Sequence, residues 1–339
     1  MKIGKVKISE YKKDFIASTN LGSDKYSYRK GWYLQIFADD CLGIGEASPL
    51  PNISLDSHSQ AGYALQGFSV ALKDIDYSIT LEELLLLSEV HGHEAPSAKF
   101  AMQSAIYDVF SKINQTSIAK YLNKKSSQVI KINSIFNKRS IIPIQDTQVL
   151  KIKISDSNIY SIKELVEKVY KQYNQDIKLR LDFNGALDLP RAIRICKELS
   201  DYNIEYIEQP VLSLDDLYEI RMHSDIPIAV DELLSDYQTA EKIIESDAAD
   251  VFIIKPSMTG GFCDVKKIVD LARGEQIKIV LTSAFETYIG QAFIAHIASA
   301  LKIKDYCGIF NISLFKDEVY PKIISSEVNI SDIKIHKVT

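Results

Sequence analysis

The stretch Lys178-Leu-Arg-Leu-Asp182, followed by Phe183-Asn184-Gly185, has the alternating pattern of a β-strand that ends on a carboxylate and then breaks at a glycine. The same event recurs downstream, where Ile204–Glu208 and Ile226–Asp231 also end on carboxylates. The next strand, Val251–Lys255, ends on a lysine before a proline. These strand ends are separated by 26, 23 and 24 residues. Strands at that period predict a parallel β/α array, which keeps its chemistry at the carboxyl ends of its strands.

The overall composition is that of an ordinary globular protein with more than one typical domain. The chain has 339 residues, of which 46% are hydrophobic and 25% charged, and its net charge is −5. The acidic balance argues against nucleic acid or an anionic membrane as the main partner. No signal-peptide pattern and no apolar run of membrane-spanning length is present, and the four cysteines have neither disulfide nor zinc spacing. We therefore expect a cytoplasmic protein with free thiols that acts on a small molecule.

The first third of the chain does not follow the β/α period. We predict an antiparallel meander from three alternating segments, with a mobile loop at Asp14–Lys30, and then three helices. The predicted strands are Lys5–Tyr11, Gly31–Ala38 and Leu42–Glu46, and the predicted helices are Ser57–Leu72, Thr80–Ser88 and Pro96–Ile113. Residues 1–125 are thus expected to form an α+β domain, to which residues 322–339 return, and residues 126–321 to form the β/α domain.

Eight strands are expected in the β/α domain. They are Ile130–Phe136, Val149–Ile154, Leu179–Phe183, the three that end at residues 208, 231 and 255, Ile277–Ser283, and one within Asp305–Asn311. Helices are predicted at Ile162–Tyr173, Leu189–Leu199, Leu214–His223, Tyr237–Ser246, Cys263–Arg273 and Gln291–Leu301. The first connection, Asn137–Gln148, contains a proline and is short for a crossover helix, so we expect a vestigial helix or an irregular loop there.

Asp182, Glu208 and Asp231 end neighbouring strands of this predicted array. Adjacent strands lie about 4.8 Å apart, so the three carboxylates can converge on one cation. Oxygen ligands favour a hard ion such as Mg²⁺. The alternative is that each acid caps the helix that follows it, but three at successive strand ends, facing lysines, favour the metal site.

Lys151 and Lys153 project from one face of the second strand, and Lys255 ends the sixth strand across the barrel. A lysine inside a barrel is costly unless it is paired or functional. A structural ion pair is an equal alternative for Lys151. For Lys153 and Lys255 we favour catalysis, with a pKa lowered by a nearby cation.

These motifs together resemble the enolase superfamily, and within it the muconate lactonising subgroup. The resemblance is carried by Lys151-x-Lys153, Asp182-x-Asn184, Glu208-Gln209-Pro210, Asp231-Glu232, Lys255-Pro-Ser…Gly260-Gly261 and Gly43-x-Gly-Glu46-Ala47. It implies an α/β fold, a modified TIM barrel of (β/α)7β type with an N-terminal α+β capping domain. It also implies Mg²⁺, for which Mn²⁺ can substitute, at Asp182, Glu208 and Asp231, with Lys153 as base and Lys255 opposite it. The use of a lysine or histidine base with Mg²⁺ is a general property of this superfamily.

The seventh strand narrows the reaction. Ser283-Ala-Phe-Glu286-Thr287 is similar to the Ser-x-x-Glu-(Ser/Thr) segment of o-succinylbenzoate synthases, which dehydrate 2-succinyl-6-hydroxy-2,4-cyclohexadiene-1-carboxylate in menaquinone biosynthesis. Dipeptide epimerases carry an Asp-x-Asp that holds the substrate's ammonium group, and Thr282–Asn311 contains none. The resemblance implies a lyase, with supporting or substrate-contacting roles for Lys151, Asn184, Glu232, Gly260 and Ser283.

Three alternatives stay open at this point. They are an N-succinylamino acid racemase or another epimerase on the same scaffold, a muconate cycloisomerase, and a barrel that binds a partner without catalysis. A simple turn before a helix is an equal alternative to carboxylate binding at Gly260-Gly261. Whether the chain forms a homo-oligomer cannot be read from one sequence.

Overall fold

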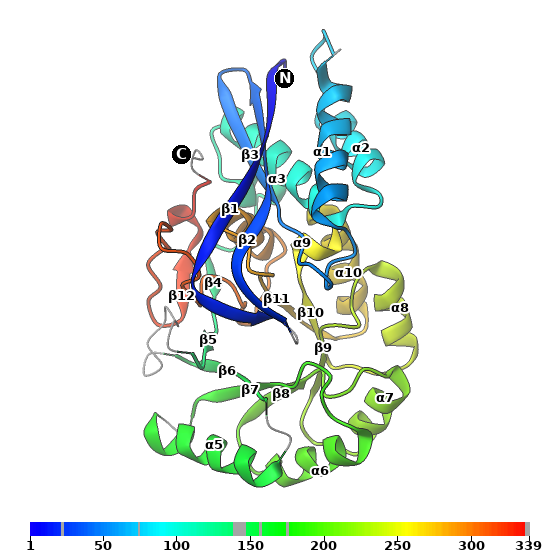
Figure 1. Cartoon of the computed structure of the whole chain (residues 1–339), viewed down its shortest axis with the longest axis vertical. Coiled ribbons are helices and arrows are strands. Elements are labelled where there is room, and N and C mark those ends of the chain that lie inside the picture. The colour runs from blue at the N-terminus through cyan, green and yellow to red at the C-terminus, as the bar shows by residue number, and fades with distance from the viewer. Residues whose placement is uncertain (22–23, 74, 138–146, 156–157, 174–175, 336–339) are drawn as a thin grey trace.

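The structure, a computed structural model, describes residues 1–21, 24–73, 75–137, 147–155, 158–173 and 176–335. Figure 1 shows an antiparallel sheet and helices α1–α3 at one end of the molecule and a parallel sheet surrounded by helices at the other. The strands are β1 (Ile3–Leu21), β2 (Asp24–Ala38), β3 (Cys41–Ala47), β4 (Val129–Lys131), β5 (Ser134–Ile135), β6 (Val149–Lys153), β7 (Lys178–Asp182), β8 (Ile204–Glu208), β9 (Ile228–Val230), β10 (Val251–Ile254), β11 (Lys278–Leu281) and β12 (Glu327–Asn329).

The first four helices precede the parallel sheet, and α5 to α11 alternate with its strands. The helices are α1 (His58–Lys73), α2 (Leu81–Gly92), α3 (Pro96–Ile113), α4 (Ile118–Leu122), α5 (Ile159–Gln172), α6 (Leu189–Leu199), α7 (Leu214–Met222), α8 (Tyr237–Glu245), α9 (Pro256–Thr259), α10 (Phe262–Gly274) and α11 (Tyr288–Ala300), with a short 3-10 turn at Ile330–Asp332. The six helices predicted for the barrel are confirmed to within a few residues, because each has a strongly apolar face that packs on the sheet.

The parallel sheet has the order β11-β10-β9-β8-β7-β6-β5, so each strand pairs with its predecessor in the sequence. The eighth strand, expected within Asp305–Asn311, is reduced to two residues. Cys307 forms a parallel bridge with Ile132, and Gly308 forms one with Thr282. The amide of Cys307 donates to the carbonyl of Lys131 at 2.7 Å, and that of Gly308 donates to the carbonyl of Leu281 at 2.9 Å. These bonds close the barrel between its first and last strands.

The strand expected at Ile130–Phe136 is divided into two. Its first part, β4, pairs antiparallel with β12 near the C-terminus, and its second part, β5, pairs parallel with β6. The vestigial helix or irregular loop expected between residues 137 and 148 falls on residues 138–146, outside the described part of the chain.

The prediction of a mobile loop at Asp14–Lys30 is wrong for the described residues, because β1 continues to Leu21, β2 begins at Asp24, and the two strands pair with each other there. Phe15 is buried against Leu314 and Phe315, and the amide of Ile16 donates to the carbonyl of Leu314 at 2.9 Å. The apolar contacts that order this extension come from a segment about 300 residues away, which local sequence patterns cannot reveal. In Figure 1 the blue strands β1 and β2 extend from the N-terminal sheet down towards the strands of the barrel.

The N-terminal sheet packs on α3 at very close range. A side chain at Gly43 or Gly45 would collide with the carbonyl of Ala105 or Ala101 of α3, so this strand needs glycine at both positions. The division into a capping domain of residues 1–125 and a barrel of residues 126–321 stays a proposal, as does the return of residues 322–339 to the capping domain. One contact agrees with that return, because Lys112 of α3 donates to the carbonyl of Ile335 at 3.4 Å.

The four cysteines are free, and Cys196 and Cys307 are buried whereas Cys41 and Cys263 are partly exposed. Among the helices that the structure describes, none combines the length and apolarity that crossing a bilayer requires.

A buried histidine on α11 gives a prediction for acid stability. Burial lowers the pKa of His296 to about 4, so the unfolded chain binds a proton there that the folded chain does not. The neutral state of His296 therefore contributes roughly 3 kcal/mol to the free energy of unfolding above pH 6.5. This contribution is lost as the pH falls towards 4. We expect His296→Gln, which keeps a donor on this side chain, to unfold with less acid sensitivity than the parent protein.

The measurement is the difference in urea unfolding free energy between variant and parent from pH 7 to pH 4. The difference is needed because Asp108, whose pKa burial raises to about 6, contributes an opposite slope in both proteins. A difference that does not change with pH would contradict the prediction.

Candidate active site

Three carboxylates gather where neighbouring strands end. Asp182 is the last residue of β7, Glu208 is the last of β8, and Asp231 directly follows β9. Asp182 pairs with Lys153 on one side and with Glu208 on the other, so the residues stand in adjacent positions along the sheet. All three carboxylates are buried.

The three predicted lysines lie against these carboxylates. Lys151 Nζ is 2.7 Å from Glu208 Oε1 and 3.0 Å from Asp182 Oδ2, and Lys255 forms an ion pair with Asp231. Lys153 is more exposed, with its Nζ 3.9 Å from Asp182 Oδ2 and 3.5 Å from Asn184 Oδ1. Lys153 at the end of β6 and Lys255 directly after β10 therefore both lie beside the same carboxylate cluster.

Burial raises the pKa of Glu208 to about 8, and the negative charge of Asp182 is the next largest cause. The pKa of Lys151 is raised well above its ordinary value, because Asp182 and Glu208 outweigh the opposing effect of burial. The pKa of Lys255 is raised for the same reason by Asp231 and Glu232, although burial alone would lower it. The lowered pKa expected for Lys153 and Lys255 requires a cation at the carboxylates and stays a prediction.

The donor set suits a hard divalent cation. Glu208 Oε2 is buried and has no hydrogen-bond partner, which is costly for a carboxylate oxygen unless a cation meets it. In the described part of the chain, the acids are not drawn together tightly enough to enclose an ion, because the ammonium groups of Lys151 and Lys255 contact their oxygens. Asp182, Glu208 and Asp231 remain the residues that would hold Mg²⁺.

Asn184 and Glu232 form a bridge beside the cluster. The backbone amide of Asn184 donates to Asp182 Oδ1 at 3.1 Å, and its side chain donates to Glu232 Oε1 at 2.8 Å. Asn184 adopts a left-handed conformation (φ 47°), as does Gly185 (φ 73°), which turns the chain sharply after the strand. Asn184 and Glu232 were both expected to support the site, and both lie beside the carboxylate cluster.

Gln209 is a supporting residue that the sequence reasoning missed. Its Oε1 accepts a hydrogen bond from the amide of Asp231 at 2.9 Å, and its Nε2 donates to the carbonyl of Val211 at 2.7 Å. Gln209 therefore orients the third carboxylate from the end of the neighbouring strand. The signal was its place directly after Glu208, but only the fold shows where its side chain points.

Arg180 is buried deeper in the barrel, where a guanidinium group needs an acidic partner. The partner is Glu205 of β8, whose Oε2 is 2.6 Å from Arg180 Nε. Arg180 also donates to the carbonyl of Tyr306 at 2.7 Å and stacks on the ring of Tyr206. These contacts satisfy most of the hydrogen-bond donors of this buried guanidinium group and balance its charge.

Ser283 and Gly260, the two remaining predicted site residues, differ in their placement. Ser283 lines the cavity above the carboxylates. Gly260 is not among the residues that line this cavity, and its amide and that of Gly261 both donate to the carbonyl of Pro256, at 3.2 and 3.0 Å. These bonds favour the alternative, a turn that joins α9 to α10, and carboxylate binding by Gly260 stays a prediction.

Glu286 supports the cavity wall from behind instead of lining it. It is fully buried, accepts a hydrogen bond from Ser257, and accepts two more from the amide of Ala284 at 2.9 and 3.0 Å. These bonds tie the loop after β11 to α9, which begins directly after Lys255. The Ser-x-x-Glu segment therefore shapes the cavity through Ser283 and holds it in place through Glu286.

The cavity has a volume of about 540 Å³, and its lining combines charged and apolar side chains. The charged part consists of the carboxylates, the lysines and Arg180. The apolar part comes from the barrel and from a loop of the N-terminal region, and it includes Leu50, Ile53, Leu55, Leu234, Met258, Phe285 and Ile312. Among the described lining residues, the acids are confined to Asp182, Glu208, Asp231 and Glu232.

A strand-end carboxylate cluster flanked by lysines, in a barrel with an antiparallel capping sheet, defines a known class of enzymes. The chain belongs to the enolase C-terminal domain-like family, whose model matches residues 144–336. Solved structures with a TM-score of 0.82–0.85 confirm the capping domain and modified TIM barrel.

The relatives divide between two reactions. The o-succinylbenzoate synthase of Thermobifida fusca is 31% identical over 172 residues, which cover 50% of this chain and 53% of that protein. The hydrophobic dipeptide epimerase of Enterococcus faecalis is 31% identical over 279 residues, or 77% of this chain and 76% of that protein. The chain thus spans about half the length of the first relative and three quarters of the second.

Two solved structures extend the likeness over nearly the whole chain. The dipeptide epimerase of Enterococcus faecalis V583, complexed with Mg and the dipeptide L-Leu-L-Tyr, has a TM-score of 0.85 at 22% identity and covers 98% of each chain. The N-succinyl Arg/Lys racemase of Bacillus cereus has a TM-score of 0.83 at 19% identity and covers 97% of this chain and 93% of that one. At these identities the likeness concerns the fold.

Proposed function

We propose that the chain is a Mg²⁺-dependent o-succinylbenzoate synthase, a cytoplasmic lyase of menaquinone biosynthesis. The observation that carries the proposal is the charge of the cavity. Its described acids all belong to the strand-end cluster, its cations are Lys151, Lys153, Arg180 and Lys255, and the rest of the lining is neutral or apolar. A substrate with carboxylates and a ring suits such a lining, whereas the ammonium group of a dipeptide would lie there without a counter-ion.

The proposed chemistry divides the roles between the two lysines. Mg²⁺ at Asp182, Glu208 and Asp231 would supply positive charge to the substrate carboxylate. Lys153 takes the proton from the carbon next to that carboxylate, and Lys255 faces the substrate from the opposite side as a cation. The bond from the adjacent ring carbon to its hydroxyl then breaks, the hydroxyl leaves as water with a proton from one of the ammonium groups, and the ring becomes aromatic.

The test is a dehydration assay with 2-succinyl-6-hydroxy-2,4-cyclohexadiene-1-carboxylate, with Mg²⁺ and then with chelator. We expect turnover with Mg²⁺ and its loss with chelator. A protein that leaves this compound unchanged while exchanging the α-proton of another substrate for deuterium would refute the proposal.

Epimerisation of a dipeptide or of an N-succinylamino acid is the second candidate. It is favoured by the Enterococcus faecalis epimerase, the relative that matches about three quarters of this chain. Deuterium uptake at the α-carbon of L-Leu-L-Tyr and of N-succinyl amino acids in D₂O, followed by mass spectrometry, distinguishes these substrates from the cyclohexadiene acid.

Metal binding itself can be measured without turnover. We expect millimolar Mg²⁺ to raise the melting temperature, because the cation offsets the repulsion of buried carboxylates and stabilises the fold by about 2.7 kcal/mol at 100 times its Kd. Glu208→Gln should remove most of that shift. Glu205→Gln, on the same strand but paired with Arg180, should lower stability and keep the shift. Equal shifts in both variants would contradict the assigned ligands.

The neutral end of the cavity can be given a charge at Asn311, which lines the cavity just after the barrel closes. We expect Asn311→Asp to lower kcat/KM for the cyclohexadiene acid about tenfold or more, because a new anion faces an all-acid substrate in a partly buried site. The matched control Asn311→Ser removes the amide without adding charge and should have a smaller effect. Equal losses in the two variants would show that charge is not what this end of the cavity selects.

A further inference from the structure

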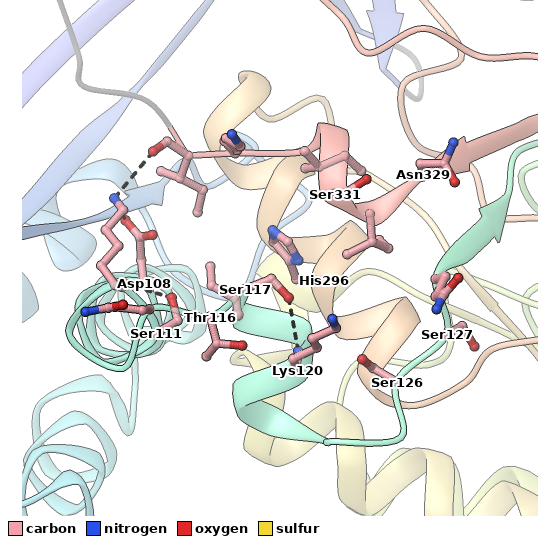
Figure 2. Close-up of a pocket in the computed structure, with 18 residues that line it drawn as sticks. Asp108, Ser111, Thr116, Ser117, Lys120, Ser126, Ser127, His296, Asn329 and Ser331 are labelled. Atoms are coloured by element: carbon pink, nitrogen blue, oxygen red, sulfur yellow. Dashed lines mark hydrogen bonds and ion pairs between the residues drawn. The ribbon is translucent and has the colours of Figure 1, made fainter.

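A second cavity, of about 800 Å³, shares no lining residue with the first. Figure 2 shows that four parts of the chain enclose it: the end of α3 with Asp108 and Ser111, α4 with its preceding turn, the connection at Ser126 and Ser127, and α11 with the C-terminal segment. The cavity therefore lies where the N-terminal helices, the barrel and the C-terminal residues meet. The proposed reaction makes no use of it.

A buried and unsatisfied imidazole faces this cavity. His296 is 2% exposed and lines the cavity, and its Nδ1 is buried with no hydrogen-bond partner. The ring interacts with the backbone of Ile333, and Nδ1 is the ring nitrogen left without a partner. A ring nitrogen of neutral histidine either donates or accepts one hydrogen bond, and a hydroxyl group can complement either role.

The polar lining is rich in hydroxyls and in positive charge. Six hydroxyl side chains contribute to it: Ser111, Thr116, Ser117, Ser126, Ser127 and Ser331. Lys112 is saturated, since its Nζ bonds Asp108, the carbonyl of Leu42 and the carbonyl of Ile335 at 2.7 to 3.4 Å. Lys120 and Lys334 also line the cavity, and neither forms an ion pair with a described residue. The cavity thus carries excess positive charge near its exposed lysines.

We propose that this cavity binds a small organic anion that carries a hydroxyl group, such as a phosphorylated or carboxylated polyol. The hydroxyl forms a hydrogen bond with His296 Nδ1, because a hydroxyl can both donate and accept one. The anionic group lies towards Lys120 and Lys334, and the serine hydroxyls bond the remaining oxygens. Burying a polar nitrogen without a partner costs free energy, so a ligand that pairs with it gains that cost in affinity.

The test titrates the full chain with glycerol 3-phosphate and with D-glycerate by calorimetry, with glycerol and inorganic phosphate as partial probes. The imidazole ¹⁵N signals are followed by NMR in parallel. We expect saturable binding of at least one hydroxylated anion, a shift of the His296 Nδ1 signal, and affinity at least tenfold above that of glycerol or phosphate. Tighter binding of one of the two anions identifies whether phosphate or carboxylate is the preferred group.

Variants separate this site from general charge effects. Lys120→Glu with Lys334→Glu should weaken binding at least tenfold, whereas Lys5→Glu with Lys7→Glu, which makes the same charge change on the exposed side of β1, should not. His296→Leu should remove the preference over inorganic phosphate. Equal binding of phosphate and glycerol 3-phosphate, no binding of either hydroxylated anion, or equal loss in both lysine pairs would overturn the proposal.

Discussion

Lys153→Ala is expected to lower kcat for dehydration about a thousandfold or more, with little change in stability. Proton transfer by a positioned side chain contributes about 10²–10⁴ to a rate, and here it would be the step that starts the reaction. The side chain is about 44% exposed and makes only long contacts, 3.9 Å to Asp182 and 3.5 Å to Asn184, so the fold does not depend on it. The measurement is steady-state dehydration together with the melting temperature.

The conservative variant Lys153→Arg distinguishes the loss of a base from the loss of a charge. Arginine keeps the positive charge beside Asp182 but stays protonated at any working pH, so it cannot take up a proton. We expect Lys153→Arg to be as inactive as Lys153→Ala while it keeps the Mg²⁺-dependent rise in melting temperature. Near-normal turnover by either variant would show that Lys153 is not the base.

The second large effect is expected from Glu46→Ala, which should destabilise the protein by roughly 3–5 kcal/mol. Glu46 belongs to β3 of the N-terminal sheet and is fully buried against the barrel. Its carboxylate accepts hydrogen bonds from the hydroxyl of Tyr11 at 2.5 Å and from the amides of Thr287 and Gly290 at 3.0 and 2.9 Å. Alanine would leave all of these buried donors without a partner.

The geometry explains why one side chain matters this much. Helix α11 begins after Thr287, which makes no side-chain cap of its own, and Gly290 is its third residue. Glu46 therefore caps a barrel helix from the other domain and satisfies amides that a helix start leaves free. Gly290 lacks a side chain because a Cβ there would be 2.5 Å from that of Glu286.

Urea unfolding of Glu46→Ala provides the measurement, and KM at low temperature provides a second one. We expect KM to rise as well, because the loop with Leu50 and Ile53 follows β3 and lines the cavity. Glu10→Ala is the control, since Glu10 pairs with Lys30 on the exposed face of the same sheet, where the effect should be small. Equal midpoints for the two variants would show that the cap does not depend on Glu46.

The part of the site that could be predicted from sequence is the part that strand geometry controls. Side chains alternate across a strand and parallel strands end at one edge, so spacing alone places Asp182, Glu208 and Asp231 side by side. The parity of Lys151 and Lys153 puts both on the inner face for the same reason. The family resemblance added the chemical roles, which spacing does not contain.

Contacts between distant segments could not be predicted in this way. The extension of β1 and β2 beyond Asp14 depends on Phe15 packing against Leu314 and Phe315, and the partner of Arg180 depends on the register of β8 against β7. Gly260 has the composition of an anion-binding turn, but Pro256 takes its amide. In each case the competing partner lies at a place that only the folded chain defines.

By itself, the sequence determined the repeat of strand and helix, the edge at which the acids and lysines meet, and the reaction class that they resemble. The tertiary structure decided how the barrel closes through Cys307 and Gly308, how Glu46 joins the cap to α11, and where His296 faces a second cavity. The physical reason is range. Local periodicity follows from backbone geometry within a few residues, whereas a buried polar group takes whichever partner the whole fold brings within hydrogen-bond distance.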